Sequence, residues 1–165
     1  MMDSRGQVSA EFLFLFGILI LIVMLSIVFV ANEQELTIAM SAARSGADEG
    51  LATSSSAIYP KDTFRDYSLS KTGLLYPYSV EIVNVSYAEL GHDVNYGKER
   101  IQFRVYAKTY ERFDTSELVS IGDRINYNLR KSVAVSFNST ASTNKLYNPV
   151  FSRHYVYTTA NVKWV

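Results

Sequence analysis

The sequence contains no cysteine in its 165 residues, which excludes disulfides, thiolate metal sites and cysteine nucleophiles together. Its net charge is zero, so it lacks the basic excess of a nucleic-acid-binding protein, and we expect no nucleic-acid partner. Proline is absent before Pro60, and acidic residues are absent after Asp123. The basic residues that follow Asp123 indicate either a solvated face or a patch for an anionic surface.

The sequence is also poor in the residue patterns of enzymes. His92 and Asp93 form its only neighbouring histidine–acid pair, and the second histidine, His154, is distant in the sequence. This pair supplies too few ligands for a metal site. Gly97-Lys98 lacks the upstream glycine of a phosphate loop, and no acid pair has the spacing of general acid–base work. We therefore expect a protein that is not an enzyme and that has no cofactor and no metal ion.

The sequence does contain one long hydrophobic run, near the N-terminus. Residues 12–31 carry no charge, and as a helix they span about 30 Å, enough to cross the hydrocarbon core of a bilayer. A conventional secretory signal has a shorter apolar region and small residues before its cleavage site, whereas bulky Phe29 would stand at that site here. A plain membrane anchor fits the length, and Arg5 would hold its N-terminus inside. Glu11, directly before the run, is costly unless it lies in the interface or finds a partner.

A small polar motif, RGQVSAE, precedes the run at residues 5–11. An ordinary signal has its cleavage site after the apolar region, so the order is reversed here. The arrangement resembles the class III signal peptide of archaeal type IV pilin-like proteins, over about residues 4–31. The resemblance implies that a prepilin peptidase cuts before Gln7 on the cytoplasmic side and leaves the apolar helix on the mature protein. It assigns leader cleavage to Arg5, Gly6, Gln7 and Ser9.

The same resemblance implies a role for Glu11. In related filaments an acidic residue five from the mature N-terminus engages a neighbouring subunit, often its N-terminal amine. A carboxylate in an apolar bundle is strongly favoured to find such a partner. The alternative is that Glu11 lies among lipid headgroups, as it could in any anchor.

The helical pattern continues beyond the apolar run. Apolar residues recur at three- and four-residue steps, which gives one stripe of a helix; they are Leu36, Met40, Ala43, Ala47 and Leu51. Gly46 and Gly50 lower the helix propensity, and Gly50 with the serines at 54–56 indicates the end. We expect one helix over about residues 8–54. The predicted organisation is a leader at 1–6, a transmembrane or filament-core helix at 7–31, an amphipathic continuation at 32–55 and a head at 56–165.

The head is predicted to contain several strands and one helix. We expect a loop at 58–78, strands at 78–87 and 100–110 joined by a hairpin-type connection, a helix from Asp114, a strand at 132–137, and one or two strands in 146–165. In the second strand the alternation predicts one inward face, formed by Ile101, Phe103, Val105 and Ala107. Arg130 and Lys131 would suit the negative pole at the end of the helix. The predicted fold class is α+β, one long helix carrying a small β-rich head with one packed helix.

Two glycosylation sequons occur in the predicted head, at Asn84 and Asn138. Asn138 lies in a predicted polar loop, where a glycan could be accommodated. Asn84 is expected in the middle of a strand, which favours it less.

These observations predict a structural subunit, major or minor, of an archaeal type IV pilus-like surface filament with a role in adhesion. It would be held in the cell membrane before assembly, in a single pass with its N-terminus cytoplasmic and its head outside. The expected partners are a prepilin peptidase, copies of itself or related pilins, and membrane lipid. The alternative is a singly anchored extracellular binding module that does not polymerise.

Overall fold

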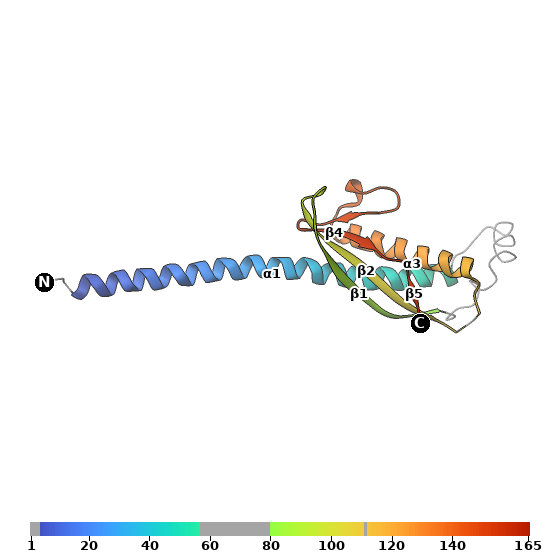
Figure 1. The fold of residues 1–165 in the computed structure, drawn as a ribbon, viewed down its shortest axis with the longest axis horizontal. Coiled ribbons are helices and arrows are strands. Elements are labelled where there is room, and N and C mark those ends of the chain that lie inside the picture. Colours follow the sequence, from blue (N-terminus) through green and yellow to red (C-terminus); the bar gives the residue numbers. More distant parts are fainter. Residues whose placement is uncertain (1–3, 57–79, 111) are drawn as a thin grey trace. The chain divides into compact units, whose positions relative to one another are not determined.

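The computed structural model describes residues 4–56, 80–110 and 112–165. Its elements follow one another along the chain as α1 (Ser4–Ser56), β1 (Val80–Asp93), β2 (Lys98–Thr109), α3 (Thr115–Ser136), the short 3-10 helix η2 (Thr140–Ser142), β3 (Val150–Phe151), β4 (Tyr155–Thr159) and β5 (Lys163–Trp164). A long N-terminal helix followed by a sheet with one further helix confirms the predicted α+β class (Figure 1). The loop expected at 58–78 lies outside the described residues.

The chain forms two compact units, Met1–Thr37 and Ile38–Val165. The described part of the first unit consists of the first half of α1 alone. The second unit, called the head below, contains the second half of α1 together with the sheet and α3. The single long helix predicted from the sequence therefore contributes to both units.

The sheet of the head is built around β2. Its strand order is β1-β2-β4-β3, with β1 antiparallel and β4 parallel to β2. β5 is also parallel to β2 but pairs farther along it, at Tyr106 and Ala107. Between β4 and β5 the amide of Ala160 donates to the carbonyl of Phe103 at 2.9 Å. β4 and β5 therefore follow β2 as two pieces of one interrupted strand.

β2 supplies the centre of the core, as its alternation predicted. Ile101, Phe103, Val105 and Ala107 are each at most 1% exposed. The ring of Phe103 stacks on that of Tyr157 in β4, with 5.6 Å between the centroids. Inward and outward residues alternate because successive side chains of a strand point to opposite faces.

The β1–β2 connection is shorter than predicted, and the C-terminal segment is more divided. β1 continues to Asp93, so the predicted connection is largely strand and only the turn at 94–97 remains. Gly97 has φ +62°, a left-handed conformation that glycine adopts without steric cost, and its amide donates to the carbonyl of Asp93. The segment after residue 146 forms three short strands instead of one or two.

Asp114 begins α3, as predicted. Its carboxylate accepts a hydrogen bond from the amide of Glu117 at 2.7 Å, and the side chain of Glu117 accepts one from the amide of Asp114 at 3.0 Å. This reciprocal capping box satisfies two donors that the helix itself leaves unpaired.

The strand predicted at 132–137 is wrong, because α3 continues to Ser136. The alternation of Val133, Val135 and Phe137 has the period of a strand, but Val133 also continues the helical stripe from Leu129. Val133 and Leu129 are fully buried, whereas Val135 is 61% exposed. Packing of the helical face therefore outweighs the strand propensity of the β-branched residues.

The longer helix also changes the place of two basic residues. Arg130 and Lys131 lie inside α3 rather than at its end, where no basic residue is found in the last turn. Arg130 donates from Nε to the carbonyl of Leu146 at 3.1 Å and from Nη1 to Thr159 Oγ1 at 2.5 Å. Burial lowers the pKa of its guanidinium, although Asp123 partly opposes this shift. Arg130 thus connects α3 to the C-terminal strands.

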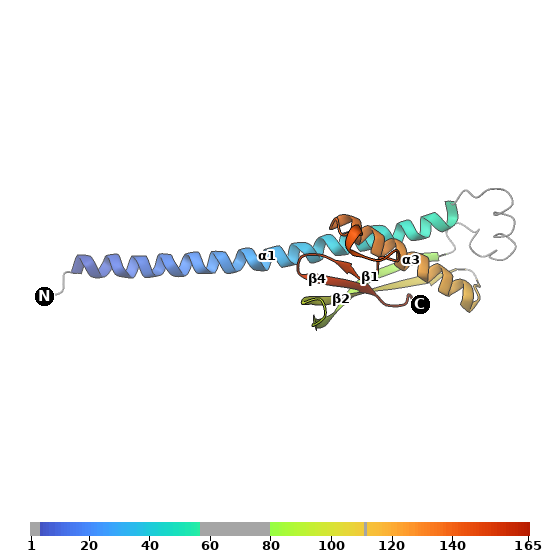
Figure 2. The ribbon, with the colours of Figure 1, turned by 90° about the horizontal axis from the view of Figure 1, so that it is seen from above.

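Within the head, the second half of α1 packs closely on α3 (Figures 1 and 2). Six of its buried residues are small: Ala39, Ala42, Ala43, Gly46, Ala47 and Gly50. A Cβ added at Gly46 would lie 2.6 Å from the carbonyl oxygen of Asn128 and 2.6 Å from Cβ of Ser132. The glycines that weaken the helical pattern in the sequence are therefore required by the close approach of two backbones.

Candidate functional site

The first half of α1 presents large apolar side chains to its surroundings. Between Phe12 and Val30 these side chains are 41% to 70% exposed. They lie on all sides of the helix, and within the described residues this is the one helix long and apolar enough to cross a membrane. A helix that is hydrophobic all round is buried in a bilayer or in a protein core. This surface therefore requires lipid or other helices around it.

Glu11 lies at the N-terminal edge of this apolar surface and is itself exposed. If the chain is cut before Gln7, the new amine and the Glu11 carboxylate are four residues apart, on the same face of the helix. The N-terminal end of a helix also favours a negative charge. Glu11 is thus placed where an N-terminal amine, its own or that of another copy, can neutralise it.

The leader positions belong to the first turns of α1, since the helix begins at Ser4 instead of at about residue 8. The bond between Gly6 and Gln7, where the resemblance implies the cut, is therefore helical. The first four amides of a helix have no intrahelical partner, and helix ends fray. The bond consequently lies near an end of α1, where breaking the helical hydrogen bonds costs little free energy.

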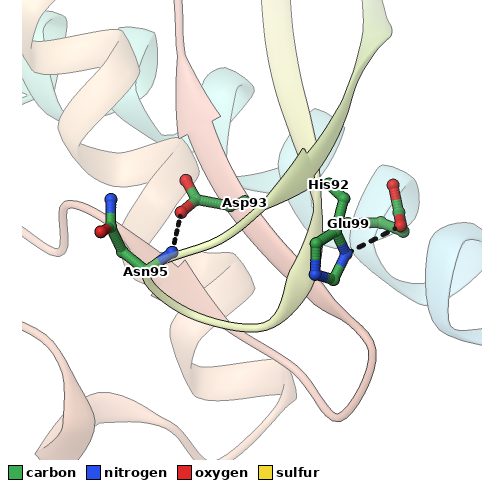
Figure 3. A network of polar contacts seen from close by, with 4 residues as sticks. All are labelled: His92, Asp93, Asn95 and Glu99. Carbon is green, nitrogen blue, oxygen red and sulfur yellow. Dashed lines mark hydrogen bonds and ion pairs between the residues drawn. The ribbon is translucent and has the colours of Figure 1, made fainter.

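The neighbouring pair His92 and Asp93 does not form a joint site (Figure 3). Nδ1 of His92 lies 3.1 Å from Oε1 of Glu99, and both side chains are more than half exposed. Asp93 is 9% exposed, and its carboxylate accepts a hydrogen bond from the amide of Asn95 at 3.0 Å, within the turn. Among the residues that the structure describes, no three His, Asp or Glu side chains are grouped so as to hold a metal ion. The contacts of His92 and Asp93 thus lie within the β1–β2 hairpin and its turn.

Both sequon asparagines have exposed side chains. Asn84 lies in β1 next to a register shift with β2, as the strand prediction placed it. Asn138 follows Phe137, the C-cap of α3, and has φ 51°, a conformation that asparagine tolerates better than most residues. The structure therefore leaves either side chain accessible to a modifying enzyme.

A hollow of about 230 Å³ opens between α3 and the C-terminal residues of the chain. Its lining includes Gly122 and Asn126 from α3 and Val162 and Trp164 from the last residues. Sequence reasoning missed it, because no local motif connects these two segments. The only relevant signal was that Trp164 is the single tryptophan of the chain.

Comparison with known proteins bears on the N-terminal segment. Residues 4–30 match the family model of the class III signal peptide. Together with the apolar N-terminal helix, this match confirms the resemblance predicted from the motif and is consistent with a type IV pilin-like protein that is secreted or displayed at the surface. Class III signal peptides are processed by prepilin peptidase. No curated protein and no solved structure matches the chain.

Proposed function

We propose that this chain is a structural subunit of an archaeal type IV pilus-like surface filament, with a role in adhesion and without catalytic activity. A prepilin peptidase removes residues 1–6. Before assembly the mature chain is held in the membrane, with its N-terminus on the cytoplasmic side and its head outside. On assembly, the first halves of α1 from many copies pack together into the filament core.

One observation carries this proposal: a class III signal peptide is continuous with a helix that is apolar on all sides. The bilayer can cover such a surface, and so can the same surface of other copies. Full burial of one large apolar side chain away from water stabilises by about 1.5–3 kcal/mol. The run at 12–30 therefore keeps the subunit out of water in both states.

Glu11 provides the specificity of the packing. Inside a core of apolar helices, an unpaired carboxylate is strongly unfavourable, whereas a carboxylate paired with an amine is tolerated. Pairing with the N-terminal amine of a neighbouring copy would therefore fix the axial position of one subunit against the next. It would also make assembly depend on cleavage, because only the cut chain has an amine at residue 7.

The test compares Glu11→Ala and Glu11→Gln with Glu33→Ala, which removes an exposed carboxylate farther along the same helix. The measurement is the ratio of subunit in sheared filaments to subunit in the membrane fraction. Loss of one partner of a buried ion pair costs about 3–5 kcal/mol, so both Glu11 variants are expected to lower the ratio at least about tenfold after normal cleavage. Glu33→Ala is expected to assemble normally. Normal filaments from Glu11→Ala would remove Glu11 from the account.

The second candidate is a singly anchored binding module that does not polymerise. The hollow lined by Trp164 favours it, because a binding function in the head needs a concave site. The same fractionation separates the two candidates. A processed chain that stays entirely in the membrane fraction, in cells that assemble other pili, supports the anchored module.

A further inference from the structure

The hollow between α3 and the C-terminal residues combines an apolar wall with polar groups. Leu118, Val119 and Val162 contribute aliphatic surface, and Trp164 contributes an indole ring. The volume of about 230 Å³ is below the range of about 300–1,000 Å³ typical for drug-sized ligands. The space therefore fits a small ligand, about the size of one six-membered ring.

Asn126 is the most buried polar residue of the lining that has an unsatisfied acceptor. It is 6% exposed, and its Nδ2 donates to the carbonyl of Ala160 at 2.9 Å. That bond fixes the orientation of the amide, and Oδ1 then finds no hydrogen-bond partner among the described residues. A buried acceptor left in this state is unfavourable. Less than 1 Å² of Oδ1 is accessible, however, so a ligand in the hollow meets the exposed carboxylate of Asp123 instead.

The other polar groups of the lining can also accept hydrogen bonds. Asp123 is exposed and adds a carboxylate to the lining, and a carboxylate only accepts hydrogen bonds. Thr115 and Asn161 add a hydroxyl and an amide that both donate and accept. A complementary ligand must therefore carry several donors, and it must also carry an apolar face for the indole of Trp164.

We propose that this hollow binds a single neutral sugar ring of a glycan. A pyranose has hydroxyl groups around its edge, which suit the Asp123 carboxylate and the side chains of Thr115 and Asn161. The C–H groups on its flat face carry a small positive charge and suit the electron-rich face of an indole. A free phosphate or an anionic ligand is disfavoured by the carboxylate of Asp123.

This inference deepens the proposed function, on which it rests for the outward exposure of the head, by naming the class of surface to which the filament would adhere. Binding itself is a property of the head and does not need assembly. If glycosides bind but the chain never enters filaments, the filament proposal fails and the sugar site stands. If filaments form but no glycoside binds, the sugar site fails and the filament proposal stands.

The experiment uses the fluorescence of Trp164, which is the single tryptophan of the chain and lines the hollow. The processed full chain, in a detergent without a sugar headgroup, is titrated with the methyl glycosides of glucose, mannose, galactose and N-acetylglucosamine. A ligand of this size is expected to bind with a Kd of about millimolar. Sorbitol serves as an open-chain polyol control, and choline tests whether the site prefers a cation.

Gly122→Ala is the blocking variant. The added Cβ would meet the side chain of Val162 at 3.4 Å and Cζ2 of Trp164 at 4.0 Å, and outside its own helix it would meet no backbone atom among these nearest contacts. It therefore takes up space in the lining of the hollow with little change to the fold, which circular dichroism verifies. We expect at least about tenfold weaker glycoside binding, since even one misplaced methyl group in a close-packed contact is felt. Asp48→Ala, an exposed acid on α1, is the matched control and should bind as the natural chain does.

The predicted result is a saturable fluorescence change with at least one glycoside, lost in Gly122→Ala and kept in Asp48→Ala. The absence of a saturable change with all four glycosides would overturn the proposal. So would an equal response to sorbitol, a stronger response to choline, or unchanged binding by Gly122→Ala.

Discussion

The two halves of α1 are built from different residues for different neighbours. Between Phe12 and Val30 the first half carries leucine, isoleucine, valine and phenylalanine that are exposed, whereas the second half buries alanine and glycine. The small residues are there because α3 of the same chain comes within direct backbone contact of Gly46. The first half has no such partner in its own compact unit. The size of the side chains thus shows which half of the helix finds its partner within the chain and which half needs one from outside.

The largest effect is expected at the leader, where Gly6→Val should abolish cleavage by the prepilin peptidase. We expect a β-branched side chain directly before the proposed scissile bond to obstruct the peptidase, because the resemblance implies a glycine at this position. The matched control is Gly17→Val, in the same helix, where a Cβ would meet nothing within 4 Å. Mass spectrometry of the N-terminus measures both. Normal cleavage of Gly6→Val would contradict the assignment of the leader.

The comparison between the halves is tested most directly by the same substitution in each. Gly46→Ala forces a Cβ to 2.6 Å from atoms of α3, and we expect about 1–3 kcal/mol of destabilisation of the head. Gly17→Ala meets open space and gains about 1 kcal/mol of helix propensity. Thermal unfolding followed by circular dichroism in detergent measures the difference. Equal effects of the two substitutions would show that α1 and α3 do not pack as described.

A smaller effect is expected at the start of α3, the helix against which the second half of α1 packs. Asp114→Ala removes the acceptor for the amide of Glu117 and should cost about 0.5–2 kcal/mol. Asp114→Asn keeps an acceptor and should cost much less, because asparagine caps helices about as well as aspartate. Chemical denaturation of the two variants measures this order. An equal loss in both would assign the effect to charge rather than to the cap.

The smallest effect concerns the surface of the head. Tyr110 donates to the Glu81 carboxylate across the hairpin, and this hydrogen bond, with the negative charge of Glu81, raises the pKa of the phenol above its ordinary value of 10. The neutral phenol is favoured in the folded state, so its contribution to stability is present at neutral pH and is lost as the pH rises through the raised pKa. Glu81→Gln should lower the pKa of Tyr110, as followed by NMR of the tyrosine rings. An unchanged titration would show that the pair does not persist in solution.

The parts of the fold that the sequence predicts are those encoded by local periodicity. The inward face of β2, the cap at Asp114 and the continuity of α1 each depend on residues close to one another in the chain. The segment at 132–137 is helical although its alternation fits a strand, because burial of Val133 beside Leu129 is decided by tertiary packing. The packing role of Gly46 is not encoded locally either, since its close neighbour in α3 is far away in the sequence.

Of the two candidate sites, the leader motif is visible in the sequence and the hollow is not. The leader motif is a linear pattern read by a peptidase, so it is visible in the sequence and is matched by the family model. The hollow at Trp164 exists because β5 returns alongside β2 and brings Val162 against Gly122. No spacing in the sequence encodes that approach, so only the folded chain shows it.

The central claim is that the first half of α1 enters a filament core after the leader is removed. It is tested most directly by shearing surface filaments from cells that express the chain with a prepilin peptidase, and by determining the N-terminus of the recovered subunit by mass spectrometry. The account predicts that this chain is present in the filaments and begins at Gln7. A chain that remains in the membrane fraction with residues 1–6 attached would contradict it.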